Sequence, residues 1–450
     1  MKFELSKSYL ERIQHELEKD TSDFILQEVT DLHAADIADI IENLNLDESK
    51  QLIDILSEDK AAEALVELDE DVREKLLPLF SPKEIADQID QLDSDDAADL
   101  LAELTEERKD LVISEMEDQD HASEIIDLLR YDEDSAGGLM QSEYVQVRAN
   151  FTVKRCIIEL RKQAEEVEKV YSIYVVNEND VLLGVLSLKR LLFAKPTSVI
   201  SDLFQYSNIR YAKTGDDKEE VAQIMQRYDL IAIPVVDRQK KLVGRITIDD
   251  IVDVMQEEAE KDYQLASGIT DNVEVSASIL KNTRSRLPWI LIGILGGILS
   301  SLILQNYETA IKINPVLAFF IPLITATGGN VGVQSSAIVV QGLASKEFKF
   351  HSVYKQILKE LAVGSLIGII CGILIFSFNF FTNTDLVMGV TIGISIFVVV
   401  IIAAIFGTLF PLLLNKLNID PALATGPFVT TTNDILGLSV YFLIAFMLYK

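Results

Sequence analysis

One acidic residue near the end of the printed sequence has the surroundings of an ion-binding group. Asp434 lies in a long apolar segment at 423–449, and no other carboxylate is expected well inside a segment of membrane length. A carboxylate at membrane depth costs several kcal/mol unless it faces water, protein or a cation. Thr430, Thr431 and Asn433 precede it and offer hard oxygen atoms that suit Mg²⁺ or Ca²⁺. We therefore predict a cation site; the alternative is a carboxylate near a helix end in the headgroup region.

A second apolar segment, 316–341, contains a polar run at 321–336. Its glycines, hydroxyls and amides are too polar for a helix that faces lipid, and Pro322 and Gly328 suit a pore lining. The alternative is that small residues let helices pack closely. Segments 357–381 and 386–414 lack this polar character, so we predict a pore between the second and fifth segments. The expected pore residues are Asp434, Asn330, Thr430, Thr431 and Asn433.

Five segments have the length of a membrane span, the first of them at 287–305. Lys281, Arg284 and Arg286 precede that span, which predicts a cytoplasmic N-terminus. An odd number of spans then places the C-terminus outside, in a multi-pass protein of the plasma (inner) membrane. Five helices are few for a full pore, so we expect a homodimer around a shared axis. These spans make residues 287–450 an all-α transmembrane domain.

Charge divides the chain into two parts. Residues 287–450 contain seven lysines and six acids, a net charge of +1, which leaves 33 bases and 65 acids, a net charge of −32, in residues 1–286. Such a field repels nucleic acid and attracts cations, so we expect no nucleic-acid partner. Two distant cysteines, four scattered histidines and the lack of a nucleophile–base pair argue against an enzyme. No cleavable signal peptide is expected, which predicts a cytoplasmic location for the acidic part.

The acidic part begins with a helical repeat. Residues 1–135 have Leu and Ile at three- and four-residue spacing, and similar stretches recur at 32–44, 56–68, 79–92 and 92–104. Short repeated helices that stack on their neighbours predict an α-solenoid. Asp95 and Asp99 are four residues apart and share one helix face. The pair repels itself unless a cation or partner lies between; the alternative is helix capping and solvation.

Two similar β-α-β-β-α units follow, at 136–200 and 201–258. Gly184 and Gly244 are expected to open the third strand of each unit. The repeat resembles a tandem pair of cystathionine-β-synthase (CBS) domains, which often bind adenine nucleotides or ions; the alternative is a generic α/β domain. An acidic helix at 249–262 begins the connection, residues 249–286, to the membrane part.

The order of these parts, together with the runs at 322–336 and 425–437, resembles the MgtE family of magnesium channels and transporters. The resemblance implies a homodimeric Mg²⁺ channel in which the second and fifth spans line the pore and Asp434 is the pore acid. It implies that the acidic connecting helix is a plug at the cytoplasmic mouth. Regulatory Mg²⁺ ions between the N-terminal, CBS and plug regions would hold the closed state. ATP at the CBS pair is left open.

The resemblance also implies a set of regulatory metal ligands in the acidic part and at the mouth of the pore. Lys261 stands where an acid is expected, which departs from the pattern. Two alternatives to Mg²⁺ import remain: a transporter of Co²⁺ or Mn²⁺, and a membrane-anchored CBS nucleotide sensor. The implied ligands are Glu63, Asp95, Asp99, Gly138 (or Gly137), Asp217, Glu219, Asp229, Asp250, Asp253, Glu258, Asp262 and Asp420.

Overall fold

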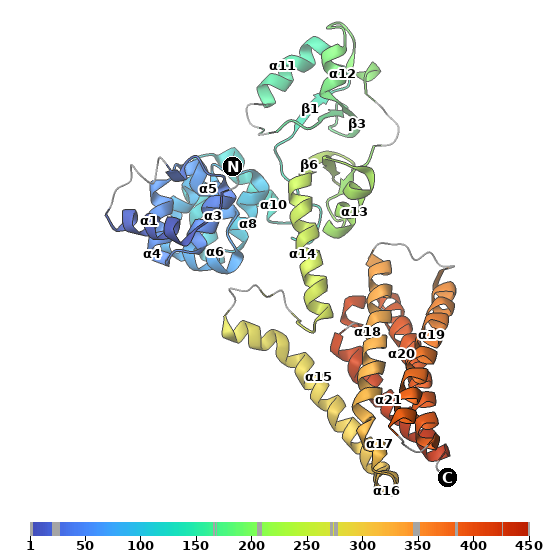
Figure 1. Ribbon diagram of the computed structural model, residues 1–450. Coiled ribbons are helices and arrows are strands. Elements are labelled where there is room, and N and C mark those ends of the chain that lie inside the picture. Colours follow the sequence, from blue (N-terminus) through green and yellow to red (C-terminus); the bar gives the residue numbers. More distant parts are fainter. Residues whose placement is uncertain are drawn as a thin grey trace. The chain divides into compact units, whose positions relative to one another are not determined.

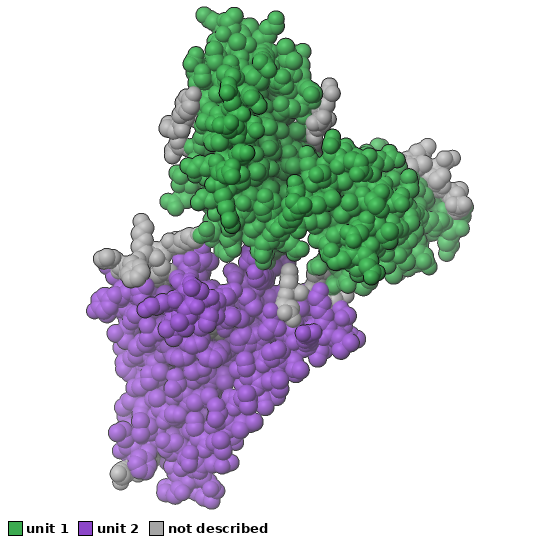
Figure 2. Space-filling model, turned by 180° about the vertical axis from the view of Figure 1, so that it is seen from behind, with its two compact units in different colours: residues 1–257 green, residues 258–450 purple. Residues whose placement is uncertain are grey.

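The computed structural model describes residues 3–19, 28–164, 167, 169–204, 209–270, 273, 278–344, 352–382, 386–424 and 426–448. The chain forms two compact units, residues 1–257 and 258–450, coloured separately in Figure 2. The multidomain fold class predicted from the sequence is confirmed: a helical N-terminal part, a CBS pair and five helices that are long and apolar enough to cross a membrane. The boundaries predicted between the domains stay a prediction.

Short helices make up the N-terminal part (Figure 1). Their starts are set by capping: Asn45 and Ser81 each begin a helix through a capping box with the glutamate three residues on. The helices are α1 (Lys7–Glu18), α3 (Ala34–Glu42), α4 (Leu46–Ile55), α5 (Glu58–Val66), α6 (Glu70–Leu76), the 3₁₀ turn η1 (Leu77–Leu79), α7 (Pro82–Ile89), α8 (Ser94–Ala102), α9 (Glu106–Glu115) and α10 (Gln119–Leu128).

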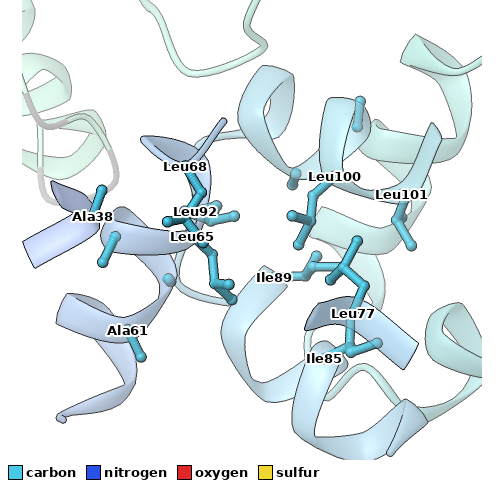
Figure 3. Close-up of a cluster of buried hydrophobic side chains, with 14 of the residues drawn as sticks. Ala38, Ala61, Leu65, Leu68, Leu77, Ile85, Ile89, Leu92, Leu100 and Leu101 are labelled. Carbon is cyan, nitrogen blue, oxygen red and sulfur yellow. The ribbon is translucent and has the colours of Figure 1, made fainter. Parts of the chain in front are cut away.

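Most of these helices pack on the next but one along the chain: α3 on α5, α4 on α6, α5 on α7, α7 on α9 and α8 on α10, whereas α1 packs on α4. The contacts are made by the apolar faces of the repeat, and Figure 3 shows Leu65, Leu68 and Leu92 meeting inside the stack. A short helix cannot bury its apolar face alone, so neighbours share one continuous core. The solenoid predicted from the repeat is therefore present in residues 34–128.

The two CBS units each contain a three-stranded sheet. In the first, β1 (Val145–Arg148) pairs in parallel with β2 (Ile173–Val176), which pairs antiparallel with β3 (Leu182–Leu186). In the second, β4 (Ala212–Lys213), β5 (Ala232–Val236) and β6 (Leu242–Thr247) repeat this order. The accompanying helices are α11 (Val153–Gln163), α12 (Leu188–Phe193), the 3₁₀ turn η2 (Ile200–Asp202) and α13 (Lys218–Tyr228).

The prediction that a glycine opens each third strand was wrong in position. Gly184 and Gly244 are the third residues of β3 and β6. The reason is clear at Gly244, where an added Cβ would lie 2.7 Å from Met140 Sδ and 2.9 Å from the carbonyl oxygen of Gln141. The absence of a side chain lets the segment at 140–141 pass directly over β6.

Helix α14 (Ile248–Ala266) follows β6 and contains the acidic connecting segment. The first four membrane helices extend beyond the predicted spans, the fifth lies within its predicted span, and a break at Phe320 divides the second span into α17 and α18. Residues 425 and 449 of the predicted fifth span lie outside the described residues. The helices are α15 (Ile279–Asn306), α16 (Glu308–Ile313), α17 (Val316–Phe319), α18 (Ile321–Ala344), α19 (Ser352–Phe381), α20 (Leu386–Lys416), the 3₁₀ turn η3 (Pro421–Ala424) and α21 (Gly426–Leu448).

Helices α18, α20 and α21 form the buried centre of the second unit. Glycines bring them together: an added Cβ on Gly407 of α20 would collide with the backbone carbonyl of Gly332 in α18. Backbones can approach this closely only where both helices lack side chains. The alternative interpretation of the small residues as packing residues is thus correct for Gly332.

Candidate ion-binding sites

Asp434 faces α18 from the third turn of α21. An added Cβ on Gly329 would lie 3.9 Å from Asp434 Oδ1 and 3.3 Å from Thr430 Cγ2. Thr430 and Asp434 are four residues apart and therefore share one face of α21. The Gly-Gly pair of α18 thus lies against the Thr-Asp face of α21. The structure brings together the two polar runs from which the sequence predicts a pore.

Asn433 is the most buried of the predicted pore residues, with 2% of its surface exposed. Its Nδ2 lies against Gly332, and neither polar atom of its amide has a hydrogen-bond partner among the described residues. A buried amide without partners costs about 1–3 kcal/mol. Asn433 is therefore a buried amide without a partner among the described residues at the contact of α18 with α21.

Thr431 and Asn330 lie apart from this face. The methyl group of Thr431 packs against Gly296 of α15, so its hydroxyl is not placed beside Asp434. Asn330 is exposed on α18 within one chain. The five predicted pore residues therefore divide: Thr430, Asn433 and Asp434 lie at the contact of α18 with α21, whereas the other two do not.

The end of α14 meets the start of α21 inside the second unit. An added Cβ on Gly268, which has φ of +81°, would lie 2.7 Å from Pro427 Cγ, and Gly426 packs against the carbonyl oxygen of Ala266. A left-handed glycine ends the helix and turns the chain here. The predicted plug helix therefore ends against the first turn of the helix that carries Asp434.

Three predicted ligands lie near this junction in the sequence but do not converge on one point. Glu258 forms an ion pair with Lys261 at 3.0 Å. Lys261 stands where the family pattern implies an acid. Asp262 is half-buried in the last turns of α14. Asp420 is exposed, and its Oδ1 accepts a hydrogen bond from Ala422 N at 2.8 Å, which starts the turn η3.

Glu360 was missed by the sequence interpretation, which expected Asp434 to be the only carboxylate well inside a membrane-length segment. Glu360 is 4% exposed in α19, and its Oε2 accepts a hydrogen bond from Ser335 Oγ of α18 at 2.9 Å. Glu360 is only the fourth residue of the predicted span, but α19 begins five residues before that span, so Glu360 is the ninth residue of the helix. Its partner, Ser335, stood in the polar run that the sequence singled out.

A chain of buried hydrogen bonds connects α8 to the second CBS unit. Asp95 Oδ2 accepts from Gln141 Nε2 at 3.1 Å, and Gln141 Oε1 accepts from Arg245 Nε at 2.6 Å. Arg245 also donates from Nη1 to the carbonyl oxygen of Lys169 at 2.8 Å. Burial, followed by the charges of Asp96 and Asp250, holds the pKa of Asp95 well above its usual range.

Asp96, which was not among the predicted ligands, lies at the centre of the acidic cluster. Burial raises the pKa of Asp96 to about 7, and the charges of Asp250, Asp93 and Asp99 add to this shift. Asp250 is itself half-buried at the start of α14, where its Oδ2 accepts from Thr247 N at 3.0 Å and Oγ1 at 2.7 Å. Carboxylates that raise one another's pKa are repelling, and a cation between them would remove the repulsion.

Asp99 has different neighbours from Asp95, although the two share a helix face. Desolvation raises the pKa of Asp99 to about 6, the charge of Glu133 adds to the shift, and Arg73 opposes it, while the side chain remains at the exposed surface. Asp253 on α14 is likewise exposed, and desolvation and the charge of Glu67 raise its pKa. The acids on α8 and on α14 thus form one continuous cluster within the first unit.

Glu63 is not part of this cluster by any described contact. Its carboxylate forms an ion pair with Lys60 at 2.7 Å, and it is Glu67, one turn later, whose charge acts on Asp96 and Asp253. Glu63 as a metal ligand stays a prediction, and the glutamate whose charge acts on the cluster is Glu67, the residue that follows the last residue of α5.

The predicted ligands of the second CBS unit lie at opposite ends of α13. Asp217 caps the helix start, where its Oδ1 accepts from Glu219 N at 2.9 Å. Asp229 follows the last residue in a left-handed conformation, and eleven helical residues span about 16 Å, too far for one ion to bind both. Gly138 N donates to the carbonyl oxygen of Ser135 at 3.0 Å, in a turn whose Gly137 bonds to Thr214 O.

Comparisons with known proteins agree with this arrangement. Family models match in order: an MgtE intracellular N domain at residues 32–134, CBS domains at 136–196 and 201–257, and a divalent cation transporter domain at 321–444. The magnesium transporter MgtE of Enterococcus faecalis is 35% identical over 331 residues, which cover 74% of this chain and 73% of that protein. The protein of the same name from Thermus thermophilus is 35% identical over 330 residues, 73% of each chain.

Two solved structures resemble the first unit. A crystal structure of the soluble part of a magnesium transporter has 30% identity and a TM-score of 0.50, and it covers 56% of this chain and 98% of its own. The cytosolic domain of the Mg²⁺ channel MgtE in complex with ATP has 33% identity and a TM-score of 0.51, over 54% and 99%. Relatives named as transporters support the expectation that the chain is not an enzyme. The full set of matched domains and the identity to these relatives show that this chain, a multi-pass membrane protein, belongs to the MgtE family.

Proposed function

We propose that this chain imports Mg²⁺ across the plasma membrane along the face where α18 meets α21, and that Mg²⁺ bound at the acidic cluster of the first unit closes this path. The relatives that cover nearly three quarters of the chain are named magnesium transporters, which supports the choice of ion. The proposal depends on one observation above the others: Asp434 Oδ1 and Thr430 lie side by side against the bare backbone of Gly329.

Mg²⁺ suits this face because it prefers oxygen ligands and gives up its water reluctantly. The carboxylate of Asp434 beside a glycine leaves room for an ion that keeps part of its water shell. The methyl group of Thr430 faces Gly329, and its hydroxyl donates to the carbonyl oxygen of Gly426 at 3.2 Å. In a homodimer two copies of Asp434 near the shared axis would form the fixed charge of the pore, and two such charges need a cation between them. The driving force is the membrane potential, worth about 2.3 kcal/mol per charge per 100 mV.

Closure would act through the acids of α8 and α14. Without cations, Asp96 and Asp250 repel each other, as their raised pKa values indicate. Mg²⁺ bound between the two helices would hold α14 in place, and the end of α14 contacts the first turn of α21 at Gly426. Loss of these ions would free α14 and with it the cytoplasmic end of the pore helix.

Flux into proteoliposomes tests the pore. Asp434→Asn should reduce Mg²⁺ uptake to the level of empty liposomes, because it removes the fixed charge while it keeps the size of the side chain. The matched control is Glu308→Gln, since Glu308 is an exposed acid of the same unit that pairs with Lys312 outside the five spans. Full uptake in Asp434→Asn would contradict the pore assignment.

Competition separates Mg²⁺ from the alternative ions. Oxygen ligands also suit Mn²⁺, so uptake of Mg²⁺, Mn²⁺ and Co²⁺ should be compared at equal concentration, with Mg²⁺ expected to be fastest. No uptake of any of the three would instead favour the membrane-anchored CBS sensor. The topology, with a cytoplasmic N-terminus and an outside C-terminus, is testable by labelling cysteines introduced at each end.

The first unit also resembles a cytosolic domain that was solved with ATP. We therefore extend the proposal to ATP binding at the CBS pair of this chain. Calorimetry on the full-length protein should detect one class of ATP site, and GTP is the control nucleotide. Equal heats for ATP and GTP, or none, would remove the adenine nucleotide from the proposal without affecting the assignment of the pore.

A further inference from the structure

Three side chains outside the acidic cluster converge between α10 and the segment that enters β1. His121, Glu124 and Glu143 each offer one ligand atom, and these atoms lie within 4.8 Å of one another. His121 and Glu124 are three residues apart and share one face of α10. Glu143 comes from the segment before β1, so the group joins two parts of the first unit that are not consecutive in the chain.

The imidazole of His121 is mostly covered, and its Nε2 has no hydrogen-bond partner among the described residues. Its side chain is 14% exposed, its Nδ1 lies 4.0 Å from Glu143 Oε1, and its Nε2 is fully covered and has no partner among the described residues. A buried polar nitrogen without a partner costs about 1–3 kcal/mol. An ion held between the imidazole and the two carboxylates would bind Nδ1, the nitrogen that lies toward Glu143.

Serine hydroxyls orient the two carboxylates. Ser94 donates to Glu143 from its backbone N at 3.1 Å to Oε1 and from Oγ at 2.8 Å to Oε2. Ser142 Oγ lies 2.8 Å from Glu124 Oε2, and Ser142 N donates to Ser94 Oγ at 2.8 Å. Carboxylates that bind metals are held in this manner by groups behind them, which fix their direction before the ion arrives.

We propose that His121, Glu124 and Glu143 bind a divalent transition metal ion of the Zn²⁺ type, at a site separate from the Mg²⁺ path. One imidazole and two carboxylates form a mixed nitrogen and oxygen set that suits Zn²⁺, whereas Mg²⁺ takes oxygen ligands. Bonds of about 2.0–2.2 Å to Zn²⁺ require ligand atoms roughly 3.3 Å apart. Glu124 is exposed and can move to close this gap, while Glu143 is held by Ser94.

Zn²⁺ titration of the full-length protein in detergent, with Mg²⁺ at saturation, tests the site. Zn²⁺ should bind the wild-type chain, and His121→Gln and Glu124→Gln should each weaken binding at least tenfold. Glu124→Gln carries little risk of misfolding, because its side chain is exposed and the amide oxygen can still accept from Ser142. The matched control is His15→Gln: the exposed side chain of His15 lies 3.9 Å from Glu18 and has no third ligand among the described residues, so its loss should leave the affinity unchanged.

Two results would overturn the proposal. Zn²⁺ affinity in Glu124→Gln equal to that of the wild type would show that the ion binds elsewhere. Equal Zn²⁺ affinities of the wild type and His121→Gln at saturating Mg²⁺ would show that the imidazole contributes nothing. Neither result bears on Mg²⁺ flux through Asp434, so the outcome is independent of the proposed transport function.

Discussion

Substitution of Gly407 tests whether the backbones of α18 and α20 are in contact. This contact fixes the position of α18, against which Asn433 and Asp434 of α21 pack. An added Cβ at Gly407 would collide with the carbonyl oxygen of Gly332 and would lie 3.0 Å from its carbonyl carbon. Ordinary C···O contacts are about 3.3–3.6 Å, so Gly407→Ala must push the helices apart by roughly 1 Å. Overpacking of this kind costs about 1–3 kcal/mol, and here a backbone rather than a flexible side chain must yield.

The measurement is the apparent melting temperature of the purified full-length protein, compared at one heating rate because membrane proteins often unfold irreversibly. A loss of 1 kcal/mol lowers the melting temperature by about 2–4 °C for a unit of this size, so Gly407→Ala should melt about 2–12 °C below the wild type. The control is Gly293→Ala, since nothing lies within 4 Å of a Cβ added there. It should be neutral or slightly stabilising, because alanine favours a helix by up to ~1 kcal/mol over glycine.

Mg²⁺ uptake should be measured for the same two variants, Gly407→Ala and Gly293→Ala. Gly332 lies one turn after Gly329, against which Asp434 is placed, so a shift of α18 at Gly332 moves the pore face. We expect slower uptake in Gly407→Ala and unchanged uptake in Gly293→Ala. Equal melting temperatures for the two variants would refute the close backbone contact and, with it, this account of how Asp434 is positioned.

Three further predictions concern the first unit. Because Asp96 has a pKa of about 7 when folded, against 3.8 as its ordinary value, the folded chain without Mg²⁺ binds more protons than the unfolded chain between about pH 4 and 7. The contribution of Asp96 to stability should therefore be largest below pH 4–5 and should fall by at most ~4 kcal/mol as the pH rises to 7. Asp96→Asn or added Mg²⁺ should make the melting temperature depend less on pH. A melting temperature that rises with pH over this range would contradict the raised pKa of Asp96. Arg73 donates to Glu103 and to the carbonyl oxygens of Leu65 and Val66 while mostly buried, so Arg73→Met should cost about 3–5 kcal/mol in urea unfolding, whereas Arg130→Met, which breaks an exposed pair with Asp127, should cost under about 1 kcal/mol. Limited proteolysis near α14 should slow when Mg²⁺ is added and should not respond to Na⁺ at equal ionic strength; equal cleavage in both salts would remove Mg²⁺ from the closure of the path.

Sequence patterns predicted the elements of this protein well, because the signals were local. Helical repeats, the order of the CBS strands and the apolar length of the spans depend on residues a few positions apart. The contact of the second span with the fifth was also predicted, since both carry glycines and hydroxyls at membrane depth. In each of these cases the physical cause is visible in the segment itself.

Sites that depend on how helices dock were predicted less completely. Periodicity placed Asp95 and Asp99 on one face of α8. It could not show that the charge of Asp250 would act on Asp96 and raise its pKa. Glu67 rather than Glu63 reaches the cluster for the same reason. His121 lies 22 residues before Glu143 and carries no motif, so only the packing of α10 brings them together.

The bonds around α8 indicate which contact in the first unit depends on ions. Segment 141–143 is held to α8 by hydrogen bonds from Gln141 to Asp95 and from Ser94 to Glu143, and these need no cation. The contact of α8 with α14, in contrast, joins Asp96 to Asp250, acids that repel each other. If Mg²⁺ bridges these acids, as the proposed function requires, its loss leaves the first contact with its hydrogen bonds and leaves the charges of Asp96 and Asp250 repelling each other at the second. The opening that the proposed function requires should therefore occur between α8 and α14, with segment 141–143 remaining on α8.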